Sequence, residues 1–242
     1  MQTALHALLE AVSALLFPAR CLGCEKQLGL CRPPLLCKDC QAKLCVIVSP
    51  LCSCCGLPFA SGADRLCLTC QQQPFAFNQA RSLFVYQEPV SSLLLQLKFG
   101  NSLAGLSTLA ALVEPADLAT VFHAPDLLVP VPLHLSRLRW RGFNQSLLLA
   151  KTCFPVWQKK IQPDLLQRHR VTVPQTQLNG AERRCNLLGA FSLRDPQAVK
   201  GRRVLLVDDV FTTGSTLREC AEVLAAAGAA GIEAFTLART VH

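Results

Sequence analysis

The chain of 242 residues lacks the long apolar runs and basic leader that would direct it to or through a membrane. No stretch approaches the roughly 18 uninterrupted apolar residues that a membrane-spanning helix needs, although 51% of the residues are hydrophobic. The apolar segment 1–17 has no basic n-region, and His6 and Glu10 interrupt it at helical spacing. This pattern favours an amphipathic helix docked on the protein over a signal peptide. Arg20 directly before Cys21 also argues against a lipoprotein cleavage site. We therefore expect a cytoplasmic protein without membrane insertion.

Cysteine, in contrast, is abundant near the start of the chain. Eleven of the 14 cysteines fall between Cys21 and Cys70, and eight of them form C-x2-C pairs separated by a dozen or so residues, as in zinc ribbons. The pairs are Cys21/Cys24, Cys37/Cys40, Cys52/Cys55 and Cys67/Cys70. Eight thiolates can hold two tetrahedral Zn²⁺ ions, with sequential or interleaved connectivity. Disulfides would call for an export signal, and a redox role suits one C-x2-C pair better than four.

The chain divides near the polar, proline-containing segment 71–77. We expect an N-terminal helix plus a double zinc-ribbon domain at 1–74 and an α/β domain at 75–242. The formal charge of +8 splits into +2 for the first part and +6 for the second. Eight thiolates and two Zn²⁺ ions bring the first part to −2, so we expect polyanions to be drawn mainly to the second part.

Residues 204–217, VLLVDDVFTTGSTL, are the most informative segment of the second part. Val204–Val207 is an apolar run of the kind buried in a parallel sheet. Asp208 and Asp209 would then emerge at the carboxyl end of the strand, where open α/β sheets bind ligands and where carboxylates can accept hydrogen bonds from ribose hydroxyls. The following turn offers backbone N–H groups, hydroxyls and a helix start, which suit a monoester phosphate; its residues are Thr212, Thr213, Gly214, Ser215 and Thr216. Gly214 lets the backbone come close because it has no Cβ. The alternative is an ordinary βα turn, but a helix cap needs only one such residue.

Other segments complete an α/β pattern with a parallel sheet. We expect strands at 80–86, 127–131 and 232–238, and helices at 90–98, 103–114, 146–154 and 217–227, with Gly228 and Gly231 after the last helix.

The order strand, acid pair, hydroxyl-rich loop and helix is similar to the ribose-phosphate signature of type I phosphoribosyltransferases, which bind phosphoribosyl pyrophosphate (PRPP). Together with the cysteine pairs, LKFGN at 97–101, PVPLH…RGFNQ within 130–145 and PQTQL…ERRCN…GAF within 174–191, the chain resembles the ComF/GntX family over nearly its whole length. This family comprises competence-type phosphoribosyltransferase-like proteins. The resemblance implies a zinc-binding N-terminal domain, a type I phosphoribosyltransferase domain, PRPP with Mg²⁺ as ligand, and a role in taking up or using external DNA beside a partner protein of the uptake machinery. The GntX name also points to gluconate utilization.

The resemblance to type I phosphoribosyltransferases implies a pyrophosphate-binding loop after the strand at 127–131, and three arginines follow this loop within five residues: Arg137, Arg139 and Arg141. Planar guanidinium groups suit a diphosphate. The alternative is a solvated basic helix face, because charge runs usually face water. Asn144 can cap the next helix.

The polar segment 168–191 has no clear periodicity and lies where such enzymes carry a catalytic lid. The candidates for lid contacts are Gln175, Thr176, Arg183 and Asn186. Arg183 joins Asp208 and Asp209 as a candidate catalytic residue, whereas a lone loop histidine such as His169 is usually just exposed.

Three functions fit these features. The first is a PRPP-binding transferase in which Mg²⁺ and basic groups hold the departing pyrophosphate. The second is a non-catalytic PRPP or nucleotide sensor whose zinc domain contacts a partner. The third is a single-stranded DNA-binding factor, for which one Tyr and two Trp leave base stacking mainly to 12 Phe. The acceptor is unidentified, but enzymes of this fold that act on 6-oxopurines carry an Asp where Thr212 stands, which argues against hypoxanthine or guanine.

Overall fold

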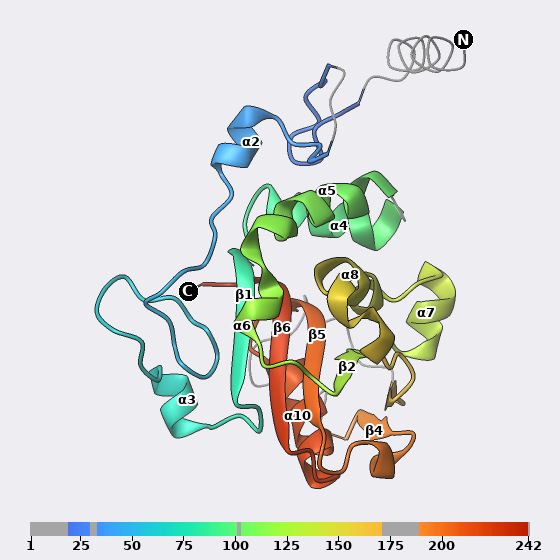
Figure 1. Ribbon diagram of the computed structural model, residues 1–242. Helices are drawn as coiled ribbons and strands as arrows, with labels where there is room; N and C mark the ends of the chain where they lie inside the picture. Colours follow the sequence, from blue (N-terminus) through green and yellow to red (C-terminus); the bar gives the residue numbers. More distant parts are fainter. Residues whose placement is uncertain (1–18, 30–32, 101–102, 171–188, 242) are drawn as a thin grey trace.

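A four-stranded parallel sheet lies at the centre of the computed structural model, which describes residues 19–29, 33–100, 103–170 and 189–241 (Figure 1). The strands follow the order β1-β6-β5-β2 across the sheet, and each neighbouring pair is parallel. Their bounds are β1 Gln79–Val85, β2 Leu127–Pro130, β5 Arg203–Phe211 and β6 Gly231–Arg239. The sheet and its helices confirm the predicted α/β class.

Helices cover both faces of this sheet because the side chains on both faces are apolar. Successive residues of β5 point to opposite faces: Leu205 packs in one core with Leu149 of α8, and Leu206 packs in another with Leu224 of α10. The first face carries α4, α5, α6 and α8, and the second carries α10 (Figure 1). The bounds of these helices are α4 Val90–Gly100, α5 Leu103–Val113, α6 Leu118–Val121, α8 Gln145–Cys153 and α10 Ser215–Ala226. Short 3-10 helices lie at η1 Glu114–Ala116, η2 Pro155–Lys160 and η4 Pro196–Ala198.

A second, two-stranded antiparallel sheet joins β3 Leu166–Arg168 to β4 Phe191–Leu193. Beyond these strands the backbone N–H of His169 donates to the carbonyl of Ala190 at 2.9 Å. The chain just before residue 171 and the chain just after residue 188 are therefore held close together. The predicted lid residues Gln175, Thr176, Arg183 and Asn186, like the helix expected within 1–17, lie outside the described residues.

The cysteine-rich part, which carries the short helices α2 Lys38–Ala42 and α3 Leu68–Gln72, packs along the sheet domain. Near its middle, the N–H of Ile47 donates to Leu83 of β1 at 2.9 Å, so this segment runs antiparallel along the outer edge of β1. Further on, Arg239 of β6 donates to the carbonyl of Cys55 at 2.6 Å, and Phe77 shares a core with four cysteines: Cys52, Cys55, Cys67 and Cys70. The domain boundary expected between residues 74 and 75 stays a prediction. Residues on both sides of it contribute to this shared core.

Several predicted element bounds need correction. Strand β5 continues to Phe211, so Asp208 and Asp209 lie inside the strand; the pairing of Asp208 with Thr236 of β6 extends it. Gly228, with a φ of +82°, follows the end of α10, whereas Gly231 begins β6. In the part of the chain that the structure describes, no helix has the length and apolar character needed to cross a membrane.

Candidate functional site

The acid pair lies at the carboxyl edge of the sheet although it is inside β5. Strand β2 pairs with β5 only as far as Pro130 opposite Val207, and the N–H of Val131 closes this pairing on the carbonyl of Val207 at 2.9 Å. Asp208 and Asp209 therefore extend beyond the end of β2. This is the edge at which parallel α/β sheets bind ligands.

The start of α8 holds Asp208 in place. Asn144 caps this helix by accepting from the N–H of Ser146 at 3.0 Å, and it donates to the carbonyl of Val131 at 3.0 Å. This places the hydroxyl of Ser146 3.0 Å from Asp208 Oδ1, to which it donates. The capping role predicted for Asn144 is confirmed. Sequence reasoning missed Ser146, whose only signal was its position after the cap.

Asp208 is poised between its two protonation states near neutral pH. Burial and the neighbouring Asp209 carboxylate raise the pKa of Asp208 to about 7, against the opposing effect of hydrogen bonds from the Asp209 N–H and from Ser146. The Asp209 N–H lies 2.9 Å from Asp208 Oδ1. Asp208 can therefore accept a hydrogen bond from a ligand hydroxyl as a carboxylate or donate one as an acid.

Asp209 forms an ion pair with a lysine from a distant part of the sequence. Lys98 Nζ, on α4, lies 2.9 Å from Asp209 Oδ2, and the two side chains are only 25% and 19% exposed. Asp209 Oδ1 accepts from the N–H of Val210 at 2.8 Å. Lys98 belongs to the LKFGN motif but was not predicted as a site residue. A single lysine in the otherwise uncharged helix α4 was the signal that could have found it.

The three predicted arginines lie on helix α7 Leu135–Arg141 but not on the same face of it. Arg137 and Arg141 are half-buried on one face, as residues four apart must be. Arg139 faces solvent, as the alternative of a solvated helix face predicts. Burial lowers the pKa of Arg141, and the Asp209 carboxylate opposes that shift, which places Arg141 in the field of Asp209. Arg141 also donates to Gln145 Oε1.

Arg168 of β3 is a further cation that the sequence analysis did not select. Burial lowers its pKa, with Arg137 acting in the same direction and Asp208 opposing. Arg141 therefore lies in the field of Asp209 and Arg168 in the field of Asp208, and Arg137 lies near both of these arginines. By contrast, the exposed ring of His169 contacts the hydroxyl of Ser192 and takes no part in this cluster.

The predicted phosphate turn is the start of α10. Thr213 Oγ1 and Ser215 Oγ lie 2.7 Å apart, and Gly214 occupies the N-cap position with a φ of +74°. A Cβ on Gly214 would lie 2.5 Å from Phe211 and 3.0 Å from Phe75, so close packing on aromatic rings requires the glycine as well as its φ. The turn is thereby fixed next to the first N–H groups of a helix, the usual setting for a bound anion. Thr212 and Thr216 flank it, both half-buried.

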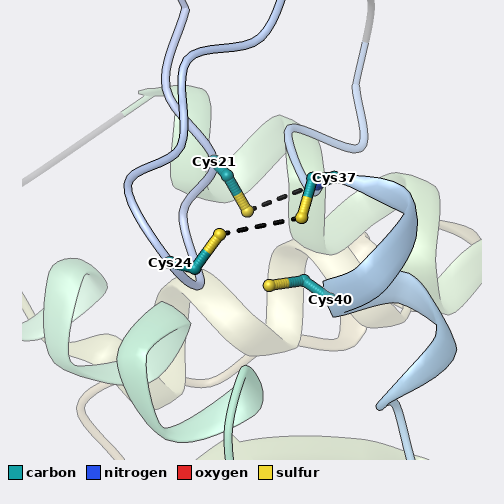
Figure 2. A group of neighbouring side chains, drawn as sticks. All are labelled: Cys21, Cys24, Cys37 and Cys40. Atoms are coloured by element: carbon teal, nitrogen blue, oxygen red, sulfur yellow. Dashed lines mark hydrogen bonds between the residues drawn. The ribbon is translucent and has the colours of Figure 1, made fainter.

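Two groups of four cysteines form in the N-terminal part, and their connectivity is sequential. Within each group the four sulfur atoms lie within 4.8 Å of one another. The first group is Cys21, Cys24, Cys37 and Cys40, and the second is Cys52, Cys55, Cys67 and Cys70. Figure 2 shows the first group, in which Cys21 and Cys24 face Cys37 and Cys40 at the start of α2. Of the eight, only Cys24 is exposed.

The donor set of both groups suits zinc. Backbone N–H groups point at the sulfur of Cys21, from Cys37 at 3.2 Å, and at the sulfur of Cys52, from Cys67 at 3.3 Å. Burial alone would raise the pKa of these two thiols, but the N–H donors lower each to about 6. Four thiolates in tetrahedral reach with N–H···S support are typical of a structural zinc site.

Comparisons with known proteins agree with both halves of this description. The double zinc ribbon domain model matches residues 12–71, and the phosphoribosyl transferase domain model matches residues 155–241. The chain is thus a phosphoribosyltransferase-type α/β protein with an N-terminal double zinc ribbon.

Relatives extend the likeness to most of the chain. DNA utilization protein YhgH of Escherichia coli (strain K12) is 36% identical over 222 residues, which cover 88% of this chain and 96% of that protein. Competence protein F of Haemophilus influenzae is 33% identical over 228 residues, with 92% and 98% covered. Competence protein ComFC of Bacillus subtilis is 28% identical over 244 residues, with 91% and 95% covered. The chain belongs to the ComF/GntX family of competence-type phosphoribosyltransferase-like proteins.

Proposed function

We propose that this protein binds PRPP, or a related ribose phosphate, at the carboxyl end of β5 and acts in the utilization of DNA. One observation carries the proposal: Asp208 and Asp209 lie at the ligand-binding edge of the sheet, directly before the turn that starts α10. In the proposed complex the two carboxylates accept hydrogen bonds from the ribose hydroxyls. The turn residues Thr213–Thr216 hold the 5-phosphate, and the arginines near the acids, Arg141 and Arg168, face the diphosphate.

Mg²⁺ fits this site when it is bound to PRPP. Three of the four carboxylate oxygens of the acid pair already have donor partners, among them Ser146 on Asp208 Oδ1 and Lys98 on Asp209 Oδ2. We therefore propose that the metal reaches the site on the oxygens of PRPP itself, where it would neutralise the diphosphate. The protein's own part is to orient the ribose through Asp208 and Asp209 and to compensate the anion with Arg141 and Arg168.

The biological setting comes from the relatives, which are named for DNA utilization and for competence. We propose that this chain works in the cytoplasm beside a protein of the DNA-uptake machinery and that each four-cysteine group binds one structural Zn²⁺. Whether bound PRPP is turned over or only sensed is decided by measuring pyrophosphate release in the presence of nucleobases and of single-stranded DNA.

A single-stranded DNA-binding role is the second candidate, and α7 favours it. This helix exposes Arg139 and also Trp140, which is 71% exposed. A basic helix face with an aromatic side chain is typical of surfaces that bind phosphate and stack bases. Titration with a single-stranded oligonucleotide tests this role. We expect binding that weakens steeply with salt and is lost when Arg137, Arg139 and Arg141 are changed together.

Isothermal titration of zinc-loaded protein with PRPP and Mg²⁺ tests the first proposal. We expect micromolar binding that the double change Asp208→Asn and Asp209→Asn abolishes. Asp126→Asn is the matched control, because Asp126 accepts from the N–H of Arg203 at the opposite end of β5, at 2.8 Å. This control should leave the affinity unchanged. Absence of binding in the intact protein would refute PRPP as the ligand.

A further inference from the structure

We propose that Lys98 exchanges Asp209 for the diphosphate when PRPP binds, so that this lysine makes the site prefer PRPP over ribose 5-phosphate. The inference rests on the proposed function and deepens it by naming the residue that recognises the diphosphate. It starts from the ion pair between Lys98 Nζ and Asp209 Oδ2, at 2.9 Å.

The surroundings of Lys98 are partly buried and largely apolar. The neighbouring side chains Leu93, Leu94 and Leu97 of α4 are buried in the apolar core, and three-quarters of the Lys98 side chain is itself covered. A partly buried ammonium that loses its counter-ion is strongly unfavourable. Lys98 must therefore keep an anion close by whatever else binds.

Ribose binding weakens the hold of Asp209 on Lys98. When Asp209 accepts a hydrogen bond from a ribose hydroxyl, the carboxylate is shared between that hydroxyl and Lys98, because each carboxylate oxygen accepts more than one hydrogen bond. PRPP supplies a second anion for Lys98, because its diphosphate is attached to the ribose beside the hydroxyls. Ribose 5-phosphate supplies no such anion, because its only phosphate binds at the start of α10. In the free protein Lys98 is thus paired with Asp209, and in the PRPP complex it pairs with the diphosphate.

The other charges near the acid pair do not make Lys98 redundant. Arg141 lies in the field of Asp209, and Arg168 lies in the field of Asp208. Arg141 is tied to Gln145 by a hydrogen bond. The Lys98 ammonium contacts Asp209 directly, and its flexible stem allows it to exchange partners.

Titration of the zinc-loaded full chain with PRPP and with ribose 5-phosphate, both with Mg²⁺, tests the exchange. We expect Lys98→Met to weaken PRPP binding at least about tenfold and to change ribose 5-phosphate binding less than about twofold, with Lys98→Arg restoring much of the loss. Equal losses for the two ligands would mean that Lys98 only positions Asp209, and this would overturn the proposal. Failure of wild-type protein to bind either ligand would instead overturn the proposed function, and this inference with it.

Inorganic pyrophosphate provides a second measurement that does not depend on Lys98→Met alone. Asp209→Asn releases Lys98 in the free protein, so pyrophosphate should bind more tightly to this variant than to wild type. Adding Lys98→Met should cancel the gain. The same gain with and without Lys98 would show a general effect of removing a negative charge and would contradict the exchange. Thermal melting of each variant verifies that it is folded.

Discussion

Replacing Gly214 by alanine probes the packing beneath the predicted phosphate turn. The φ of Gly214 is +74°, and a Cβ there would lie 2.5 Å from Phe211 Cζ and 2.9 Å from Phe211 Cε1. The left-handed conformation costs an L residue about 1 kcal/mol, and overpacking of a filled core costs about 1–3 kcal/mol. We therefore expect Gly214→Ala to lower the free energy of unfolding by about 2–4 kcal/mol.

Gly201 provides the matched control for this change. Its φ is +70°, but nothing lies within 4 Å of the position that a Cβ would take. Gly201→Ala should therefore cost only about 1 kcal/mol. Thermal melting of the zinc-loaded proteins measures both, with about 2–4 °C expected for Gly201→Ala and about 5–15 °C for Gly214→Ala. Equal shifts for the two variants would refute the clash with Phe211, and Phe211→Leu should restore part of the stability only in the Gly214→Ala background.

Three further predictions concern pH, charge and metal. Because the pKa of Asp208 is raised from 3.8 to about 7, its contribution to folding stability is lost as the pH rises through that interval. Asp208→Asn should thus raise the melting temperature more at pH 8 than at pH 5. An equal increase at both pH values would contradict the raised pKa of Asp208. Arg141→Gln should weaken PRPP binding several-fold in titrations, whereas Arg139→Gln, on the solvent face of α7, should not; equal losses would reject this division. A chelator should remove zinc first from the four-cysteine group that contains the exposed Cys24. A zinc indicator dye should therefore report two phases of zinc release, and Cys24→Ser should accelerate only the first; a single phase would contradict this order.

The local features of the site could be predicted from the sequence because each is a short-range pattern. The cysteine spacing indicates paired metal ligands, and the structure adds that consecutive pairs close on each other. The capping of α8 by Asn144 and the start of α10 beside Gly214 also follow from local chemistry. Even the outward position of Arg139 follows from helical geometry once α7 is known to be a helix.

The contacts of the acid pair could not be predicted in this way. Lys98, Ser146 and Arg168 belong to three different elements, and only the packing of these elements brings them to Asp208 and Asp209. Periodicity assigns a residue to a face but does not say which distant residue meets it. The length of β5 was missed for a similar reason, because pairing with β6 carries the strand past its apolar run.

The packing of the cysteine-rich part against the sheet domain was also beyond the sequence. Phe75 and Phe77 stack at 4.5 Å between ring centroids, and Phe75 also meets Phe211 beneath the turn at Gly214. A polar, proline-containing segment predicts a linker, yet its aromatic residues belong to the core. The segment between the zinc groups and the sheet therefore supports the candidate phosphate site from below.

A crystal structure of the zinc-loaded protein with PRPP is the most direct test of the central claim. We expect density for the 5-phosphate at the backbone N–H groups of Thr213–Thr216, and density for the ribose hydroxyls within hydrogen-bond distance of Asp208 and Asp209. Density for PRPP anywhere else, with the acid pair still closed on Lys98 and Ser146, would contradict it.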